Sequence, residues 1–252
     1  MKASRPGRIW ALVATQAASH GGRVAAADAC VAAVAGVEVT GAWMSAQSGT
    51  EASHLMCVTD GVSQHLAELE LTLGEGPGPD AAASGGPALA SDLGGIEAAH
   101  RWPLFAPAAC QAGAAAIFAF PLLIGAIRVG VMGLYRDRPG PLSASRLGDA
   151  LVFVDTATLL LLGSQDQAAG DPAAAAAPPA GQTADLALHR AEIDQATGML
   201  TEQLGVGIAD AFIRLRAYAY AHDQRLTDVA RDIVARRLRL RPDPGRASNR
   251  QT

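Results

Sequence analysis

Apolar and polar positions change their spacing twice along this chain of 252 residues. Up to about residue 165, segments with apolar residues every three or four positions alternate with short runs rich in β-branched and aromatic residues. Residues 168–182 carry three prolines among alanines and have no periodicity, whereas residues 183–240 return to helical spacing without a single proline. The pattern predicts an α+β domain, a linker and an all-α domain.

The first part is expected to hold five helices, at residues 9–19, 24–35, 62–71, 102–111 and 143–162. Its five expected strands lie at residues 37–45, 54–60, 87–91, 115–120 and 128–135. The last two strands are expected to pair as a hairpin around Gly125, and Ser143 to cap the last helix. Strands placed before and after helices, with a late antiparallel hairpin, predict an antiparallel sheet flanked by helices.

Three amphipathic helices are expected beyond the linker. They cover residues 185–204, residues 208–222, and a segment that starts at Thr227 as N-cap with Asp228 in its first turn. The apolar stripes that would meet in a small bundle are Leu186, Ile193, Ala196, Leu200 and Leu204; Ile208, Phe212, Leu215 and Ala219; and Val229, Ala230, Ile233 and Leu238. The resulting division is a domain at 8–163, a linker at 164–184, a three-helix domain at 185–241 and a disordered tail at 242–252.

Composition narrows the class of protein. Half of the residues are hydrophobic, which excludes global disorder, and three cysteines cannot close a disulfide framework. With no secretory leader at its start, the chain is expected to be reduced and cytoplasmic. Residues 112–135 imitate a membrane span, but Pro121 and the central Arg128 favour two buried strands instead.

Charge is distributed unevenly. No Lys or Arg lies between Arg23 and Arg101, whereas residues 212–241 hold eight arginines against three aspartates. On the second helix of the bundle, Arg214 lies one turn from Tyr218 on one flank, and Arg216 one turn from Tyr220 on the other. Arg231, Arg236 and Arg237 extend the positive charge along the third helix. Guanidinium groups beside aromatic rings favour looped or single-stranded nucleic acid, although a solvated surface with tyrosines at the core edge gives the same pattern.

Gly198 is unusual because a glycine inside a helix costs about 1 kcal/mol relative to alanine. Close approach of another helix, or of a ligand backbone, explains such a choice, and helix packing is the favoured interpretation.

The bundle resembles the ANTAR domain, on AEIDQATGML at 191–200, AFIRLRAYA at 211–219 and LTDVA at 226–230. The resemblance implies a three-helix RNA-binding module of transcription antitermination regulators, which binds paired hairpin loops in leader transcripts. Carried onto this chain, the RNA-facing residues are Gln195, Ala196, Thr197, Gly198, Arg214, Arg216, Tyr218 and Tyr220. Thr197 stands where many members have a basic residue, and Ala196 and Gly198 would act by being small.

The region at about 8–163 resembles a GAF domain, on LTLGEGPGPD at 71–80, SDL at 91–93, RWP at 101–103, FPL at 120–122 and VMGLY at 131–135. The resemblance implies a sensing or dimerising fold around an antiparallel sheet, with an unknown small molecule as ligand. Together the two resemblances predict a cytoplasmic regulator without catalytic activity, metal, cofactor or membrane contact. The helix at 143–162 is the expected contact of a homodimer.

Other functions remain open on the sequence. The bundle could bind protein in a ligand-regulated dimerisation module, or bind duplex DNA as a helix-turn-helix. Two of Cys30, Cys57 and Cys110 could form a thiol enzyme of the kind that reduces free methionine sulfoxide, if their Cα atoms approach within about 7 Å. A haem-binding GAF domain is a further alternative, although His54, His65 and His100 have no metal-ligand spacing. The run GEGPGP at 74–79 is interpreted as a loop, because it lacks the Lys-Ser/Thr of a P-loop and its prolines remove backbone donors.

Overall fold

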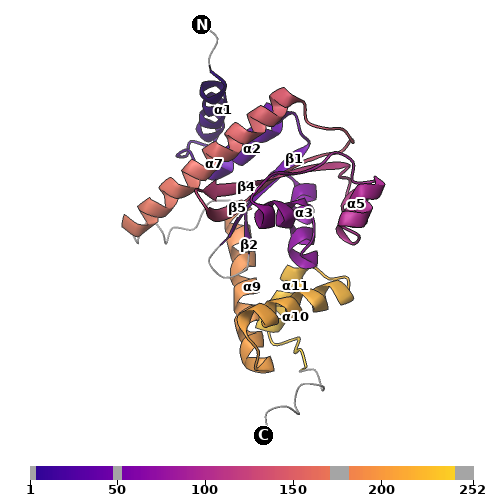
Figure 1. Ribbon diagram of the computed structural model, residues 1–252. Coiled ribbons are helices and arrows are strands. Elements are labelled where there is room, and N and C mark those ends of the chain that lie inside the picture. Colours follow the sequence, from indigo (N-terminus) through magenta and orange to yellow (C-terminus); the bar gives the residue numbers. More distant parts are fainter. Residues whose placement is uncertain (1–3, 48–52, 171–181, 242–252) are drawn as a thin grey trace.

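The computed structural model describes residues 4–47, 53–170 and 182–241 (Figure 1). The helices of the first part are α1 (Arg5–Ser19), α2 (Ala26–Val37), α3 (Gly61–Leu73), α4 (Pro77–Ser84), α5 (Ile96–Arg101), α6 (Phe105–Gln111) and α7 (Ala144–Gly170). Its strands are β1 (Gly41–Gln47), β2 (Ser53–Val58), β3 (Ala88–Ala90), β4 (Ala116–Ile124) and β5 (Ile127–Arg136). Three helices follow: α9 (Gln182–Leu204), α10 (Ile208–Ala221) and α11 (Leu226–Val234).

The five strands form one sheet in the order β2-β1-β5-β4-β3, and every neighbouring pair is antiparallel. The β4–β5 hairpin is its centre, with Phe120 opposite Met132 and a tight turn that begins at Gly125. Long apolar side chains alternate between the two faces of β4, so both faces need a cover. The predicted α+β class is therefore confirmed.

Helices α1, α2 and α7 cover one face of the sheet. Ile9 and Phe153, from α1 and α7, are completely buried against Phe118, Phe120 and Met132 of the central hairpin. In Figure 1, α7 crosses the sheet beside α2. The Ser143 hydroxyl accepts a hydrogen bond from the Arg146 N–H at 3.3 Å, as expected of an N-cap.

The opposite face packs on α3, α4, α5 and α6. Trp43 of β1, Leu66 of α3 and Phe105 of α6 form the centre of this second core. Gly133 of β5 makes room for the indole, since a Cβ at that position would lie 2.2 Å from the ring of Trp43. Leu186 of α9, from the C-terminal part, is also buried in this core.

The three C-terminal helices form a bundle with its own core. Phe212, Leu215 and Ala219 on α10 meet Ala196 and Leu200 of α9, together with Val229, Ala230 and Ile233 of α11. Helical spacing thus identified most of the buried positions, but Ile208, expected on the α10 stripe, is 54% exposed, and Leu186 is buried in the N-terminal core instead. Gly205 ends α9 with a positive φ of 62°. In Figure 1 the bundle lies beside β2 and α3.

Several expected boundaries differ from the observed ones. The predicted N-cap at Thr227 is wrong, because α11 begins at Leu226 with Arg225 at the N-cap, and Thr227 is buried inside the first turn. The run GEGPGP is not only a loop, since Pro77 starts α4. The helix expected at 102–111 is α6, preceded by the separate short helix α5.

The expected linker at 164–184 and the expected tail at 242–252 lie mostly outside the described residues. Helix α7 continues through Gly170 and α9 begins at Gln182, so helices occupy both ends of the expected linker at 164–184. Residues 171–181 and the expected tail at 242–252 lie outside the described residues. The domain boundaries as such stay a prediction.

Phe212→Ala is expected to destabilise the bundle by about 3–5 kcal/mol, because the ring is 7% exposed and its removal leaves a cavity. Ile213→Ala is the matched control, since Ile213 is the next residue along α10 and its side chain is 56% exposed. Equilibrium denaturation followed by circular dichroism measures both. Equal stability of the two variants would contradict the core assignment.

Candidate nucleic-acid interface

The residues that the ANTAR resemblance implies for RNA binding divide into exposed and buried groups. Gln195, Gly198 and Tyr220 are exposed, and the tyrosine ring keeps 53% of its surface. Arg214 is partly exposed on α10. Nothing lies within 4 Å of a Cβ built on Gly198. Helix packing, the favoured explanation of this glycine, is therefore wrong, and an open surface remains.

Two members of the set are inside the bundle. Ala196 is completely buried, and Thr197 is 5% exposed. The Thr197 hydroxyl donates a hydrogen bond to the Ile193 carbonyl at 2.8 Å, the usual bond of a threonine back onto its own helix. Neither side chain can reach a phosphate from this position. Their role in the motif is packing that supports the exposed neighbours.

Tyr218 is partly buried at the edge of the bundle core. Its ring stacks on the ring of His222, with centroids 3.9 Å apart and an interplanar angle of 17°. The carbonyl of Tyr218 also lies 2.9 Å from Nδ1 of His222. The two rings form a platform of the kind on which an unpaired base stacks.

The arginines on α11 and just after it carry less free charge than the sequence indicated. Arg231 forms ion pairs with Glu192 at 3.2 Å and with Asp228 at 3.1 Å. Arg237 pairs with Asp232 at 2.7 Å. These pairs are largely exposed, so they contribute little to stability, but they neutralise much of the positive field expected along α11.

Arg216 is different, because it is bound to the N-terminal part of the chain. Its Nε–H donates to the carbonyl of Thr72 in the last turn of α3, at 2.9 Å. Partial burial lowers the pKa of its guanidinium, which nevertheless remains charged. Of the two residues placed on this flank of α10, Tyr220 faces solvent and Arg216 faces α3.

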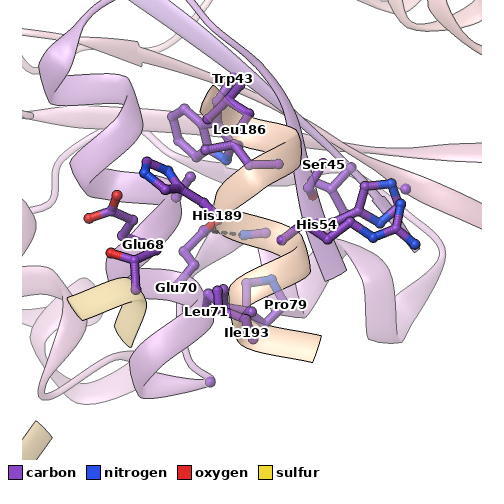
Figure 2. A pocket seen from close by; sticks show the side chains of 18 of the residues that line it. Trp43, Ser45, His54, Glu68, Glu70, Leu71, Pro79, Leu186, His189 and Ile193 are labelled. Carbon is purple, nitrogen blue, oxygen red and sulfur yellow. Dashed lines mark hydrogen bonds between the residues drawn. The ribbon is translucent and has the colours of Figure 1, made fainter. Parts of the chain in front are cut away.

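A cavity of about 300 Å³ lies between the sheet, α3, α4 and the bundle (Figure 2). Trp43, Leu55 and Leu71 contribute from the N-terminal part, and Leu186, Ile193 and Phe212 from the bundle. Figure 2 shows Leu186, His189 and Ile193 pointing from α9 toward the side chains of the other wall. A volume of this size accommodates a small organic molecule.

Three titratable residues of the cavity wall were not singled out from the sequence. Burial raises the pKa of Glu70 to about 8, although the Gly78 N–H donates to its Oε1 at 2.6 Å. Burial, together with the charge of Arg190, lowers the pKa of His54 to about 4. Within the described residues, His54 Nδ1 and Glu68 Oε2 are buried without a hydrogen-bond partner. Glu68 Oε2 has an ion-pair partner, because it lies 3.5 Å from Nε of Arg225. The His54 nitrogen costs free energy unless a ligand or water satisfies it.

One sequence signal pointed toward Glu70. Glu70 lies four residues after Leu66, on the same side of α3, and that side packs into the core. Helical spacing therefore indicates that the carboxyl group of Glu70 is buried. No such signal existed for His54 or Glu68, since their environment depends on how α9 packs on the sheet.

The cysteines give limited support to a thiol enzyme. Cys30 and Cys57 are both buried on the α2 side of the sheet, and the hydrogen bond that the Cys30 thiol donates to Cys57, together with burial, raises the pKa of Cys30 well above its ordinary value. A thiol that stays protonated is a weak nucleophile. Cys110 is exposed, and burial of part of its surface also raises its pKa.

Residues 4–47, 53–170 and 182–241 contain neither a membrane-spanning helix nor a metal-binding cluster. No helix in these ranges combines the length and apolar character that crossing a bilayer requires. No cluster of three or more His, Cys, Asp or Glu side chains in the same ranges is arranged to hold a metal ion.

Comparison with known proteins identifies the bundle. Residues 183–234 match the family model of the ANTAR domain, so the chain contains an ANTAR domain there. A GAF domain of a phosphoenolpyruvate-protein phosphotransferase from Coxiella burnetii is similar to this chain, with 10% identity over 66% of this chain and 99% of that domain, and a TM-score of 0.49. The corresponding GAF domain from Acinetobacter has 10% identity over 66% and 98%, with a TM-score of 0.46. No curated protein matches the sequence.

Glu70→Gln is expected to remove a pH dependence of stability. The folded protein holds the proton of Glu70 up to a pH of about 8, whereas an unfolded chain releases it near 4.5. Stability therefore falls as the pH rises from 5 to 8, because ionisation favours the unfolded state. Denaturation midpoints measured across this range should decline less in the variant. An identical decline in both proteins would contradict the burial of a neutral carboxyl group.

Proposed function

We propose that this chain is a signal-responsive, RNA-binding transcription antitermination regulator. Its C-terminal bundle binds hairpin loops in leader transcripts, and the N-terminal domain receives the signal. The ANTAR match over residues 183–234 carries the proposal, and the bundle core at the expected positions supports it. The function is binding rather than catalysis.

The RNA-binding surface is formed by α9 and α10. Gln195, Gly198 and Tyr220 are exposed there, and Arg214 is partly exposed on the other flank of α10. An open glycine lets a sugar–phosphate backbone approach the helix, an amide reads base edges, and a tyrosine ring stacks on an unpaired base. Arginine binds phosphate through a planar fork of donors. Arg216 and Tyr218 complete the surface when α10 is accessible.

The N-terminal domain is a GAF-like sensor, and its ligand is a small organic molecule bound in the cavity beside α3. The cavity volume of about 300 Å³ and the buried His54 Nδ1, which has no hydrogen-bond partner within the described residues, support this assignment. A homodimer would present two bundles to two hairpins and gain avidity. Leu151 and Leu159, exposed on α7, support a dimer contact along that helix.

Crosslinking in cells followed by sequencing of bound transcripts tests the proposal. Leader transcripts with two adjacent hairpins upstream of a terminator are the expected product. Affinity for such an RNA should fall steeply with salt, because phosphate binding releases counterions. Crosslinks to protein alone would favour the dimerisation module instead, and preference for duplex DNA over hairpin RNA would favour a helix-turn-helix regulator.

Tyr220→Ala is expected to weaken binding of the crosslinked leader RNA by about 1–3 kcal/mol, because a stacked base loses its platform. Ile208→Ala, which truncates another side chain that is about half exposed at the start of α10, is the control. Filter binding at fixed salt measures both. Unchanged affinity in a folded Tyr220 variant would exclude this ring from the interface.

A further inference from the structure

The contact between Arg216 and α3 uses the Nε–H of the guanidinium group and places a terminal nitrogen of that group against Gly74. The Arg216 Nε lies 2.9 Å from the Thr72 carbonyl, and a Cβ built on Gly74 would lie 1.9 Å from the terminal nitrogen. Only a glycine at position 74 leaves room for the arginine. The guanidinium therefore cannot lie against α3 and bind a phosphate through the same atoms.

The contact lies at the C-terminal end of α3, which explains why a guanidinium group binds there. Thr72 and Gly74 end α3, where the last carbonyls of a helix have no partner within the helix and carry partial negative charge. A guanidinium group is a favourable partner for such carbonyls. The partner is nevertheless a neutral carbonyl, so an anionic phosphate competes well for the same donors.

Neighbouring residues hold the two parts together around this point. Leu71 of α3 packs against the bundle core, and Leu186 of α9 is buried in the core of the N-terminal domain. Arg225, just before α11, forms an ion pair with Glu68 of α3 at 3.5 Å. One turn of α3 therefore binds two helices of the bundle.

We propose that the C-terminal turn of α3 is an autoinhibitory latch that withholds Arg216 from RNA. RNA binding and docking of the bundle on α3 compete for this guanidinium, so the docked arrangement is the low-affinity state. A signal that loosens the docking raises RNA affinity without changing the bundle itself. This inference rests on the proposed RNA-binding function and names its regulation.

Two glycines of the chain provide a matched test. Gly74 and Gly85 end α3 and α4 with φ values of 70° and 71°, and each N–H donates to the carbonyl four residues earlier. A Cβ at Gly85 meets nothing within 4 Å. Gly74→Ala and Gly85→Ala thus introduce the same backbone strain, but only the first displaces Arg216.

In the full-length chain, Gly74→Ala is expected to bind the crosslinked leader RNA about fivefold or more tightly than wild type, a typical size for coupling between sites. Gly85→Ala should match wild type. In an Arg216→Ala background, Gly74→Ala should have no further effect, because the latched group is absent. Leu186→Ala, which weakens docking without touching the bundle core, should also raise affinity.

A measurement without RNA separates the latch from the proposed function. Reactivity of Arg216 toward phenylglyoxal, read by peptide mass spectrometry, should rise in Gly74→Ala relative to Gly85→Ala. RNA binding by wild type with equal affinities for both glycine variants would overturn the latch and leave the proposed function intact. Absence of RNA binding by every variant, despite greater Arg216 reactivity, would overturn the proposed function and the regulatory role together.

Discussion

The arrangement of this molecule depends on the last turn of α3, because three consecutive residues of that turn contact three different parts of the structure. Glu70 is buried toward the cavity, Leu71 faces the core of the bundle, and the carbonyl of Thr72 accepts a hydrogen bond from Arg216. A helix end normally satisfies its last carbonyls with water or its own cap. Here the bundle supplies a guanidinium instead, and the two parts of the chain pack as one.

The small size of the bundle makes such docking favourable. Three short helices bury a thin core, and apolar side chains at its margin need another surface. Leu186 finds that surface in the N-terminal domain rather than among its own helices. The same helix also lines the cavity beside Trp43 and Glu70, so the walls of that cavity come partly from the bundle.

Much of the fold followed from local pattern. Short runs rich in β-branched and aromatic residues identified the five strands, and the late hairpin indicated the antiparallel class. Positions such as Phe212, Leu215 and Ala219 were correctly placed in the bundle core, because three- and four-residue spacing alone puts them on one side of a helix. Errors arose where two signals competed. Thr227 has the side chain of an N-cap, yet α11 begins one residue earlier, and its burial matters more than its capping propensity.

The sequence by itself determined most of the helices and strands, the central residues of the bundle core, and that the last helices form an ANTAR domain. Those properties depend on neighbours within a turn or two, or on a motif of contiguous residues. The tertiary structure alone determined the environments of Arg216 and Tyr220, which share a flank of α10. Helix α3 covers Arg216, whereas Tyr220 is exposed. The tertiary structure also decided the burial of His54, Glu68 and Leu186, since their partners come from distant parts of the chain and no local pattern encodes that docking.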